Sequence, residues 1–227
     1  MGLVHSSVNN SSFRDALIEA GANADFVIRN ANTVVSRLQG NLGTLTEDEA
    51  RVIAGYTVEV PEGQGESMYT VLNTALRGDR SMSSMMRIRD LFMMFLGALR
   101  KLPLVEIPVL HRGIDVHIDL TGQTATFSAF TSTSASKNVA REFVGRQGSG
   151  TVLTFEHCFG YDISKFSLFP QEQEVLIEPE TKFLILSVEP GTITTASCDH
   201  IPSMPILQGI TSMRHTYDYL CQKWGRR

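Results

Sequence analysis

The sequence contains too few cysteines for the protein classes that depend on them. Three cysteines in 227 residues are a small, odd number. Their wide spacing fits neither a disulfide framework nor a zinc site with paired ligands. One disulfide and three reduced thiols both stay open as interpretations, and reduced thiols are the simpler one. The cysteines are Cys158, Cys198 and Cys221.

An excess of positive charge is also missing. Twenty basic residues stand against 24 acidic ones, which gives a formal net charge of −4. Proteins that hold a phosphate backbone usually carry a strong positive field, so we expect no nucleic-acid partner. Histidines are sparse as well, and only His111 and His117 lie near each other. We therefore expect no metal site.

Long apolar runs are absent too. The best candidate, residues 91–99, is far shorter than the roughly 20 apolar residues that a membrane-spanning helix needs. The first residues lack the basic stretch and the apolar run of about 7 to 15 residues that mark a secretory signal. We expect no transmembrane segment. Localisation stays open between the cytoplasm and a delivered or secreted effector.

The first half of the chain has helical patterns. Thr46 and Glu49 have the spacing of a capping box, in which each side chain accepts a hydrogen bond from the other's backbone, and they predict a helix over about 46–56. A second helix is predicted over about 81–101, because apolar residues recur there at three- and four-residue spacing. This stripe consists of Met85, Ile88, Phe92, Phe95, Leu99 and Leu102.

The second half changes to short β-branched and aromatic runs separated by glycines, which predict strands. One helix over about 136–144 interrupts them, with Ser136 as its N-cap, and a last helix is expected near 215–224. The fold class is therefore α+β: a helical lobe over about 1–102 and a β-rich core over about 103–227, in a single domain. The predicted strands cover 105–110, 124–131, 151–155, 175–177 and 183–188.

Two glutamates, Glu172 and Glu174, stand two residues apart where a loop enters an apolar run. The two-residue period of a strand would point both carboxylates to one side. Such a pair can divide its work between proton transfer and the stabilisation of a developing cation. One alternative is two solvated side chains, and another is a retaining glycoside hydrolase, in which the carboxyl groups lie about 5 to 5.5 Å apart.

Arg112 ends a predicted strand and precedes Gly113, whose missing side chain would let a ligand approach the backbone. A guanidinium there can clamp a phosphate with two hydrogen bonds or pair with a surface carboxylate. His111 beside it is expected to have a backbone partner rather than to act as a base. The hydroxyl cluster over 131–134 follows a predicted strand, where hydroxyls usually cap and turn.

Taken in order, Arg112, the triplet Ser132-Thr133-Ser134 and Glu172-x-Glu174 resemble the R-S-E class of ADP-ribosyltransferases, in particular its vertebrate-type and toxin-type mono-ADP-ribosyltransferases. The resemblance implies two packed, mainly antiparallel β-sheets around an NAD cleft. It also implies an arginine-specific mono-ADP-ribosyltransferase, which cleaves NAD at the nicotinamide N-glycosidic bond and transfers ADP-ribose to arginine side chains of proteins.

The resemblance also implies roles for the motif residues. Arg112 would hold the NAD phosphates, and Gly113 would offer backbone hydrogen bonds to the nicotinamide amide. Ser132 would orient Glu174, which stabilises the positive charge that develops on the ribose. Glu172 would bind the acceptor arginine and help to deprotonate it.

Two further positions match the family. Phe143 occupies the place of an aromatic that packs on the nicotinamide, although its spacing from Val139 also fits a core position. Arg146 occupies a loop position where a basic residue meets phosphate. NAD is expected as co-substrate, with no metal, and a protein modified on arginine as partner. An NAD glycohydrolase and a non-catalytic NAD-binding module are the alternative functions.

Overall fold

The computed structural model describes residues 10–78, 81–115, 124–144, 150–189 and 193–198. Two compact units make up the chain. The first contains residues 1–105 and the segment Tyr161–Glu174, and the second contains Glu106–Gly160 and the residues from Val175 on. That the units form a single domain stays a prediction. Arg146, His117 and the expected helix near 215–224 lie outside the described residues.

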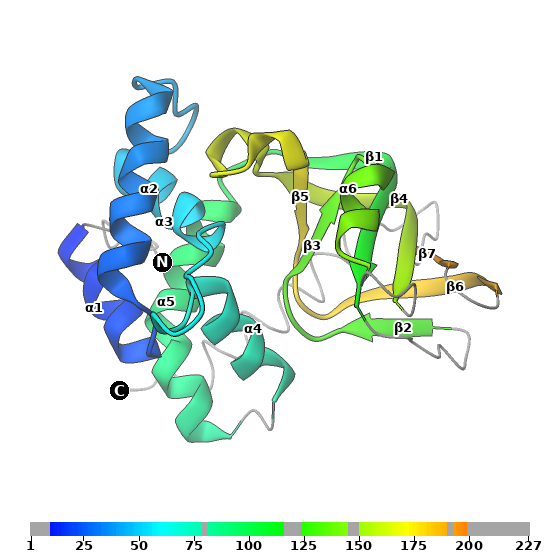
Figure 1. Ribbon diagram of the computed structural model, residues 1–227, viewed down its shortest axis with the longest axis horizontal. Helices are drawn as coiled ribbons and strands as arrows, with labels where there is room; N and C mark the ends of the chain where they lie inside the picture. Colours follow the sequence, from blue (N-terminus) through cyan, green and yellow to red (C-terminus); the bar gives the residue numbers. More distant parts are fainter. Residues whose placement is uncertain (1–9, 79–80, 116–123, 145–149, 190–192, 199–227) are drawn as a thin grey trace, which may run out of the picture. The chain divides into compact units, whose positions relative to one another are not determined.

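The first unit is helical, as the sequence predicts, and Figure 1 shows its helices in blue to green. No helix in the described part of the chain is long and apolar enough to cross a membrane. The helices are α1 (Asn10–Ala20), α2 (Ala24–Leu38), α3 (Glu47–Tyr56), α4 (Met68–Arg77) and α5 (Met82–Leu99).

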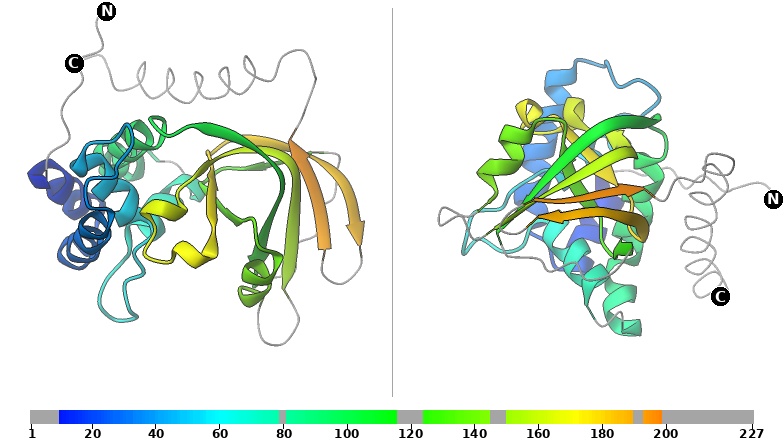
Figure 2. Two further views of the ribbon diagram at one scale, coloured as in Figure 1. Left: turned by 90° about the horizontal axis from the view of Figure 1, so that it is seen from above. Right: turned by 90° about the vertical axis from the view of Figure 1, so that its right-hand side faces the viewer.

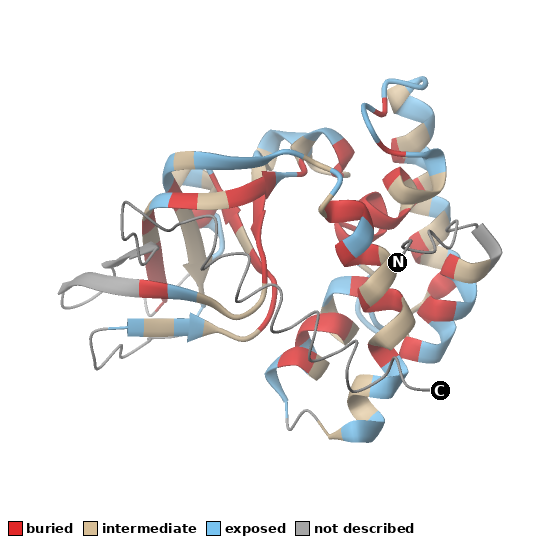
Figure 3. Ribbon diagram, turned by 180° about the vertical axis from the view of Figure 1, so that it is seen from behind, coloured by how far each residue is buried: buried red, intermediate tan, exposed pale blue. Residues whose placement is uncertain are grey.

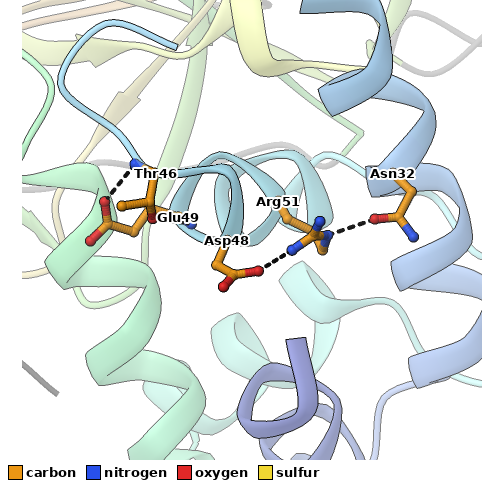
Figure 4. Close-up of polar contacts among 5 residues, drawn as sticks. All are labelled: Asn32, Thr46, Asp48, Glu49 and Arg51. Atoms are coloured by element: carbon orange, nitrogen blue, oxygen red, sulfur yellow. Dashed lines mark hydrogen bonds and ion pairs between the residues drawn. The ribbon is translucent and has the colours of Figure 1, made fainter. Parts of the chain in front are cut away.

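The predicted capping box at the start of α3 is confirmed. The Thr46 hydroxyl accepts from the Glu49 backbone N–H at 3.2 Å, and a Glu49 carboxylate oxygen accepts from the Thr46 N–H at 3.0 Å. Further along the helix, Arg51 forms an ion pair with Asp48 and donates to the Asn32 side chain of α2 at 2.6 Å. Figure 4 shows both groups of contacts, which fix the start of α3 and connect α3 to α2.

The apolar stripe of α5 packs inside the helical unit. Ile88, Phe92, Phe95 and Leu99 are buried, as the spacing predicts. The Phe95 ring stacks on Tyr56 at 4.4 Å between ring centroids. The hydroxyl of this buried tyrosine accepts from the buried Asn73 amide of α4 at 3.0 Å, so these two buried polar groups pair with each other. Figure 3 colours buried residues red, and in this unit they gather where the helices face one another.

The second unit is built on a sheet, and the prediction of N-terminal helices followed by antiparallel sheets is confirmed. Among the described residues, hydrogen bonds join seven strands into one sheet in the order β1-β3-β5-β4-β7-β6-β2, with an additional pairing of β1 and β4. The strands are β1 (Leu104–Ile114), β2 (Thr124–Phe127), β3 (Thr131–Ser134), β4 (Thr151–Asp162), β5 (Glu174–Ile177), β6 (Thr181–Glu189) and β7 (Ile193–Cys198).

The strand pairings explain where the sequence prediction was incomplete. β2 and β6 pair antiparallel, and so do β6 and β7, whereas β7 runs parallel to β4. Figure 2 shows β6 and β7 side by side in orange. The prediction of one strand over 124–131 is wrong, because the first strand, β2, ends at Phe127 and a second strand, β3, begins at Thr131. β7 was missed because its polar sequence, ITTASC, lacks a long apolar run.

Aromatic and branched residues from five strands form the core of the sheet. The rings of Phe127, Phe155 and Phe183 lie within 6.0 Å of one another, centroid to centroid. Around them pack Leu110, Leu153, Cys158, Val175 and Ile177, all buried. Burying a side chain of this size contributes about 1.5 to 3 kcal/mol. This core therefore holds β1, β4, β5 and β6 in register near the motif residues.

Candidate functional site

Arg112 and Ser132 lie together in the structure, although 20 positions separate them in the sequence. Arg112 is in β1 and Ser132 in β3, two strands that pair antiparallel with His111 opposite Ser134. The Arg112 guanidinium donates through Nη1 to the Ser132 carbonyl oxygen at 2.8 Å. Both residues are half-buried. This hydrogen bond fixes the direction of the arginine side chain relative to β3.

The neighbouring strand, β5, begins at Glu174. Thr133 connects β3 to it, because its buried hydroxyl donates to the Val175 carbonyl oxygen at 2.7 Å. The strand order β1-β3-β5 therefore carries Arg112, Ser132 and Glu174 on three consecutive strands. Only the pairing of strands far apart in sequence brings these three motif positions into adjacent strands.

The hydroxyl cluster is a strand and not a turn, which corrects the interpretation from composition. Thr131, Thr133 and Ser134 are buried in β3, and Ser132 is half-buried. The Thr133 hydroxyl donates to the neighbouring strand β5, and the Ser134 hydroxyl accepts from the Ser136 N–H at 2.9 Å. Threonine has a high β propensity, which outweighs the turn preference of serine in this segment.

The space at Gly113 is occupied by the chain itself. A Cβ atom at this position would lie 1.8 Å from the Ala140 carbonyl oxygen and 3.0 Å from the Phe143 Cβ. Gly113 therefore lets helix α6 (Lys137–Glu142) pack against β1. The sequence suggested that the missing side chain leaves room for a ligand beside Gly113. In the structure, helix α6 fills this room.

Helix α6 is shorter than predicted, and its start lacks the expected cap. Ser136 occupies the N-cap position but its side chain makes no capping hydrogen bond. Phe143 follows the helix and is 50% exposed, and Val139 is only half-buried, so the core interpretation of this pair is wrong. The buried residue of α6 is Ala140, which faces Gly113. An exposed aromatic ring is available for stacking.

His111 makes a side-chain contact, not the backbone contact expected. Its Nδ1 lies 3.2 Å from the Thr154 hydroxyl of β4. Burial lowers the pKa of His111 below its ordinary value, and the positive charges of Lys137 and Arg141 lower the pKa further. These two cationic side chains are four residues apart on α6 and lie close enough to His111 in β1 to affect its pKa. Sequence reasoning missed them, and their spacing on one helix face was the available signal.

Glu172 and Glu174 are not in one regular strand. Glu172 ends the 3₁₀ turn η2 (Pro170–Glu172), and Glu174 opens β5. Gln173 between them adopts the left-handed conformation, with φ 49° and ψ 49°. The period-two argument is therefore wrong, since it requires three extended residues. Both glutamates are half-buried.

The described part of the chain offers little for metal or thiol chemistry. Residues 10–78, 81–115, 124–144, 150–189 and 193–198 contain no cluster of three or more histidines, cysteines or acidic residues that could hold a metal ion. Cys158 is a free thiol, fully buried in the core of the sheet. Its sulfur lies 3.7 Å from the Glu156 carbonyl oxygen.

Comparison with known proteins supplies the context for this arrangement. The putative NAD(+)--arginine ADP-ribosyltransferase Mav of Mycobacterium avium is 34% identical over 161 residues, which are 66% of this chain and 18% of that protein. The erythroblast NAD(P)(+)--arginine ADP-ribosyltransferase of Gallus gallus is 33% identical over 151 residues, 62% of this chain and 47% of that protein. In both cases the chain spans less than half of the relative's own length.

The fold has solved counterparts as well. The crystal structure of the eucaryotic mono-ADP-ribosyltransferase ART2.2 matches with a TM-score of 0.64 over 87% of each chain, at 18% sequence identity. The family described as NAD:arginine ADP-ribosyltransferase matches residues 28–193, which include the motif positions on β1, β3 and β5. The chain has the ADP-ribosyltransferase fold and belongs to the NAD:arginine ADP-ribosyltransferase family.

Proposed function

We propose that this protein is a mono-ADP-ribosyltransferase that transfers ADP-ribose from NAD to arginine side chains of proteins. The observation that carries the proposal is the placement of Arg112, Ser132 and Glu174 on three consecutive strands. Family membership supports NAD as the substrate. Family membership also disfavours the glycoside hydrolase alternative, in which Arg112 and Ser132 would have no role.

In the proposed reaction, the bond between the anomeric carbon and the nicotinamide nitrogen breaks, and nicotinamide leaves with the electron pair. Glu174 stabilises the positive charge that develops on the ribose, and Ser132 orients this carboxylate. Preorganised electrostatic groups of this kind contribute about 3 to 4 kcal/mol to the transition state. A guanidine nitrogen of the acceptor then forms the new bond to the same carbon, and its proton passes to Glu172.

Positive charge near β1 supports a phosphate site. Arg112 is the proposed clamp for the NAD phosphates, because a guanidinium can donate two parallel hydrogen bonds to phosphate oxygens. Lys137 and Arg141 on α6 supply further positive charge, and the same two charges lower the pKa of His111 in β1. Phe143 is proposed to pack on the nicotinamide, which its 50% exposure permits. Gly113 and Arg146 stay proposed NAD contacts, through a backbone group and a side chain respectively.

The decisive experiment follows both products of NAD. The protein is incubated with labelled NAD and agmatine, a small alkyl guanidine, while nicotinamide release and ADP-ribosyl-agmatine are measured. We expect both from the wild type. Glu174→Gln should lower both rates by at least about 100-fold, and Glu172→Gln should lower transfer more than hydrolysis. Glu62→Gln, an exposed carboxylate of the helical unit, serves as control.

Each alternative function has its own outcome. Free ADP-ribose as the only labelled product of the wild type would identify an NAD glycohydrolase and end the transferase proposal. NAD binding without turnover would identify a non-catalytic binding module. Calorimetry with NAD tests the clamp, because Arg112→Ala should weaken binding about tenfold or more. An unchanged affinity would remove Arg112 from the site.

A further inference from the structure

The segment Tyr161–Glu174 connects two strands of the sheet but belongs to the helical unit. It contains the turns η1 (Ser164–Phe166) and η2, and it ends at the two motif glutamates. Figure 1 draws this segment in yellow. Its contacts with α2 and α3 lie within one unit and show how the helical unit can act on Glu172, the residue proposed to bind the acceptor.

One contact comes from the last turn of α2. Arg37 donates through Nη2 to the Ser167 carbonyl oxygen at 2.7 Å and approaches the Lys165 carbonyl oxygen at 3.5 Å. Lys165 in turn donates to the Asn41 side chain at 3.0 Å. A hydrogen bond with a charged donor is roughly twice as strong as a neutral one. Arg37 therefore restrains the backbone of the segment at Ser167.

A second contact comes from the end of α3. The buried Thr57 hydroxyl donates to the Ala54 carbonyl oxygen at 2.9 Å and accepts from the Leu168 N–H at 3.1 Å. Leu168 also packs with Leu38 against the small apolar cluster formed by Ala31, Val34 and Ala54. Side chains of two helices therefore hold two successive backbone groups, the Ser167 carbonyl and the Leu168 amide.

From these two points a series of short-range hydrogen bonds leads to Glu172. The fully buried Ser167 hydroxyl accepts from the Phe169 N–H at 3.0 Å. The Phe169 carbonyl oxygen accepts from the Glu172 N–H at 3.0 Å, which closes η2. At the other end of the segment, the Ile163 N–H donates to the Glu174 carbonyl oxygen at 3.0 Å. The backbone of Glu172 is thus connected to Arg37 and Thr57 through one turn.

We infer that Arg37 and Thr57 are positioning residues for the acceptor step, which fix the turn that carries Glu172. This inference rests on the proposed function of Glu172. Glu174 has a separate support, because it opens β5 next to the link between Thr133 and Val175. Loss of the helical contacts should therefore displace Glu172 more than Glu174. A displacement of about 1 Å can lower a rate by about 100-fold.

The test compares Arg37→Gln with Arg29→Gln, which removes an exposed arginine from the same helix two turns earlier. In Arg37→Gln, we expect transfer to agmatine to fall by about 10- to 100-fold, while NAD hydrolysis stays within about threefold of wild type. Arg37→Lys keeps the charge and should restore part of the transfer. Thr57→Val should resemble Arg37→Gln, and Thr57→Ser should resemble the wild type.

Amide hydrogen exchange provides a readout that needs no activity. The amides of Leu168, Phe169 and Glu172 should exchange faster in Arg37→Gln than in Arg29→Gln. If the wild type does not turn over NAD, the proposed function fails, yet the exchange still shows whether Arg37 holds the turn. Equal ratios of transfer to hydrolysis in both variants, or equal exchange at these amides, would overturn the inference. A parallel loss of transfer and hydrolysis would also overturn it, since it would indicate a general structural role.

Discussion

Gln173 is the residue whose backbone conformation separates the two motif glutamates. It holds φ 49° although it is not glycine, and left-handed backbone costs a non-glycine residue about 1 to 2 kcal/mol. Its side chain is exposed. The conformation is therefore sustained by the turn on one side and by β5 on the other.

Substitutions at Gln173 should show this cost. Gln173→Gly should leave the free energy of unfolding within about 1 kcal/mol of wild type, because relief of strain offsets the added freedom of the unfolded chain. Gln173→Val should lower it by about 1 to 2 kcal/mol. Urea unfolding measures both. Gln171→Val, at an exposed neighbour with ordinary φ, is the control, and an equal loss there would contradict the prediction.

His111 should make stability depend on pH. Burial, then Lys137 and Arg141, lower its pKa in the folded protein, so the unfolded chain binds the proton more readily. This contribution is complete above about pH 6.5 and is lost as the pH falls from there towards the folded-state pKa. Urea unfolding between pH 7.5 and 5.5 should show a larger loss for wild type than for His111→Gln. Identical losses would remove His111 as the cause.

At the scale of elements, helix starts differ in what holds them. The hydroxyl of Thr46 caps α3, whereas Ser136 occupies the same position before α6 without a capping bond from its side chain. Thr46→Ala should cost about 1 to 2 kcal/mol of unfolding free energy, and Ser136→Ala less than about 0.5 kcal/mol. Thermal or urea unfolding checks this. Similar costs at both positions would show that the caps are not the reason.

The contact between α6 and β1 depends on Gly113. Gly113→Ala should lower the free energy of unfolding by about 1 to 3 kcal/mol, because the new methyl group overlaps the Ala140 carbonyl oxygen. Gly97→Ala in α5 meets open space and should instead raise it by up to about 1 kcal/mol. Urea unfolding of both proteins measures the contrast. A Gly113→Ala protein as stable as wild type would mean that α6 can move away freely.

Some elements were predictable because their signals are local. The capping box of α3 is confirmed, and so is the burial of Ile88, Phe92, Phe95 and Leu99 in α5. The other two residues of the predicted stripe, Met85 and Leu102, are only half-buried, and Leu102 follows the end of α5. The strand over 124–131 was wrong, because residues 128–130 leave the sheet although their composition resembles their neighbours. β7 was missed because its place depends on pairing with β4 and β6, and no short window of sequence contains that information.

At the scale of the whole molecule, each of the two units contains an apolar cluster among its described residues. Ala31, Val34 and Ala54 belong to the helical unit, and the cluster that contains Phe155 and Cys158 belongs to the sheet. The segment Tyr161–Glu174 belongs to the helical unit, although in the sequence it lies between strands β4 and β5 of the sheet.

The buried thiol of Cys158 offers a probe of the second unit. In a Cys198→Ser/Cys221→Ser protein, labelling of Cys158 should be at least about 1,000-fold slower than in urea-unfolded protein, because opening the core costs several kcal/mol. The labelling rate should rise with urea along with the loss of helical circular dichroism. Fast labelling in the absence of urea would show that this core opens locally.

By itself, the sequence determined the α+β class, the helical first half and the family, because helix patterns and short motifs are written in neighbouring residues. Tertiary structure decided which motif positions meet. Arg112, Ser132 and Glu174 reach consecutive strands only through pairing across 20 or more residues, and the turn at Gln173 depends on how Tyr161–Glu174 packs on α2 and α3. Such contacts depend on the packing of distant segments, which local propensity and periodicity do not encode.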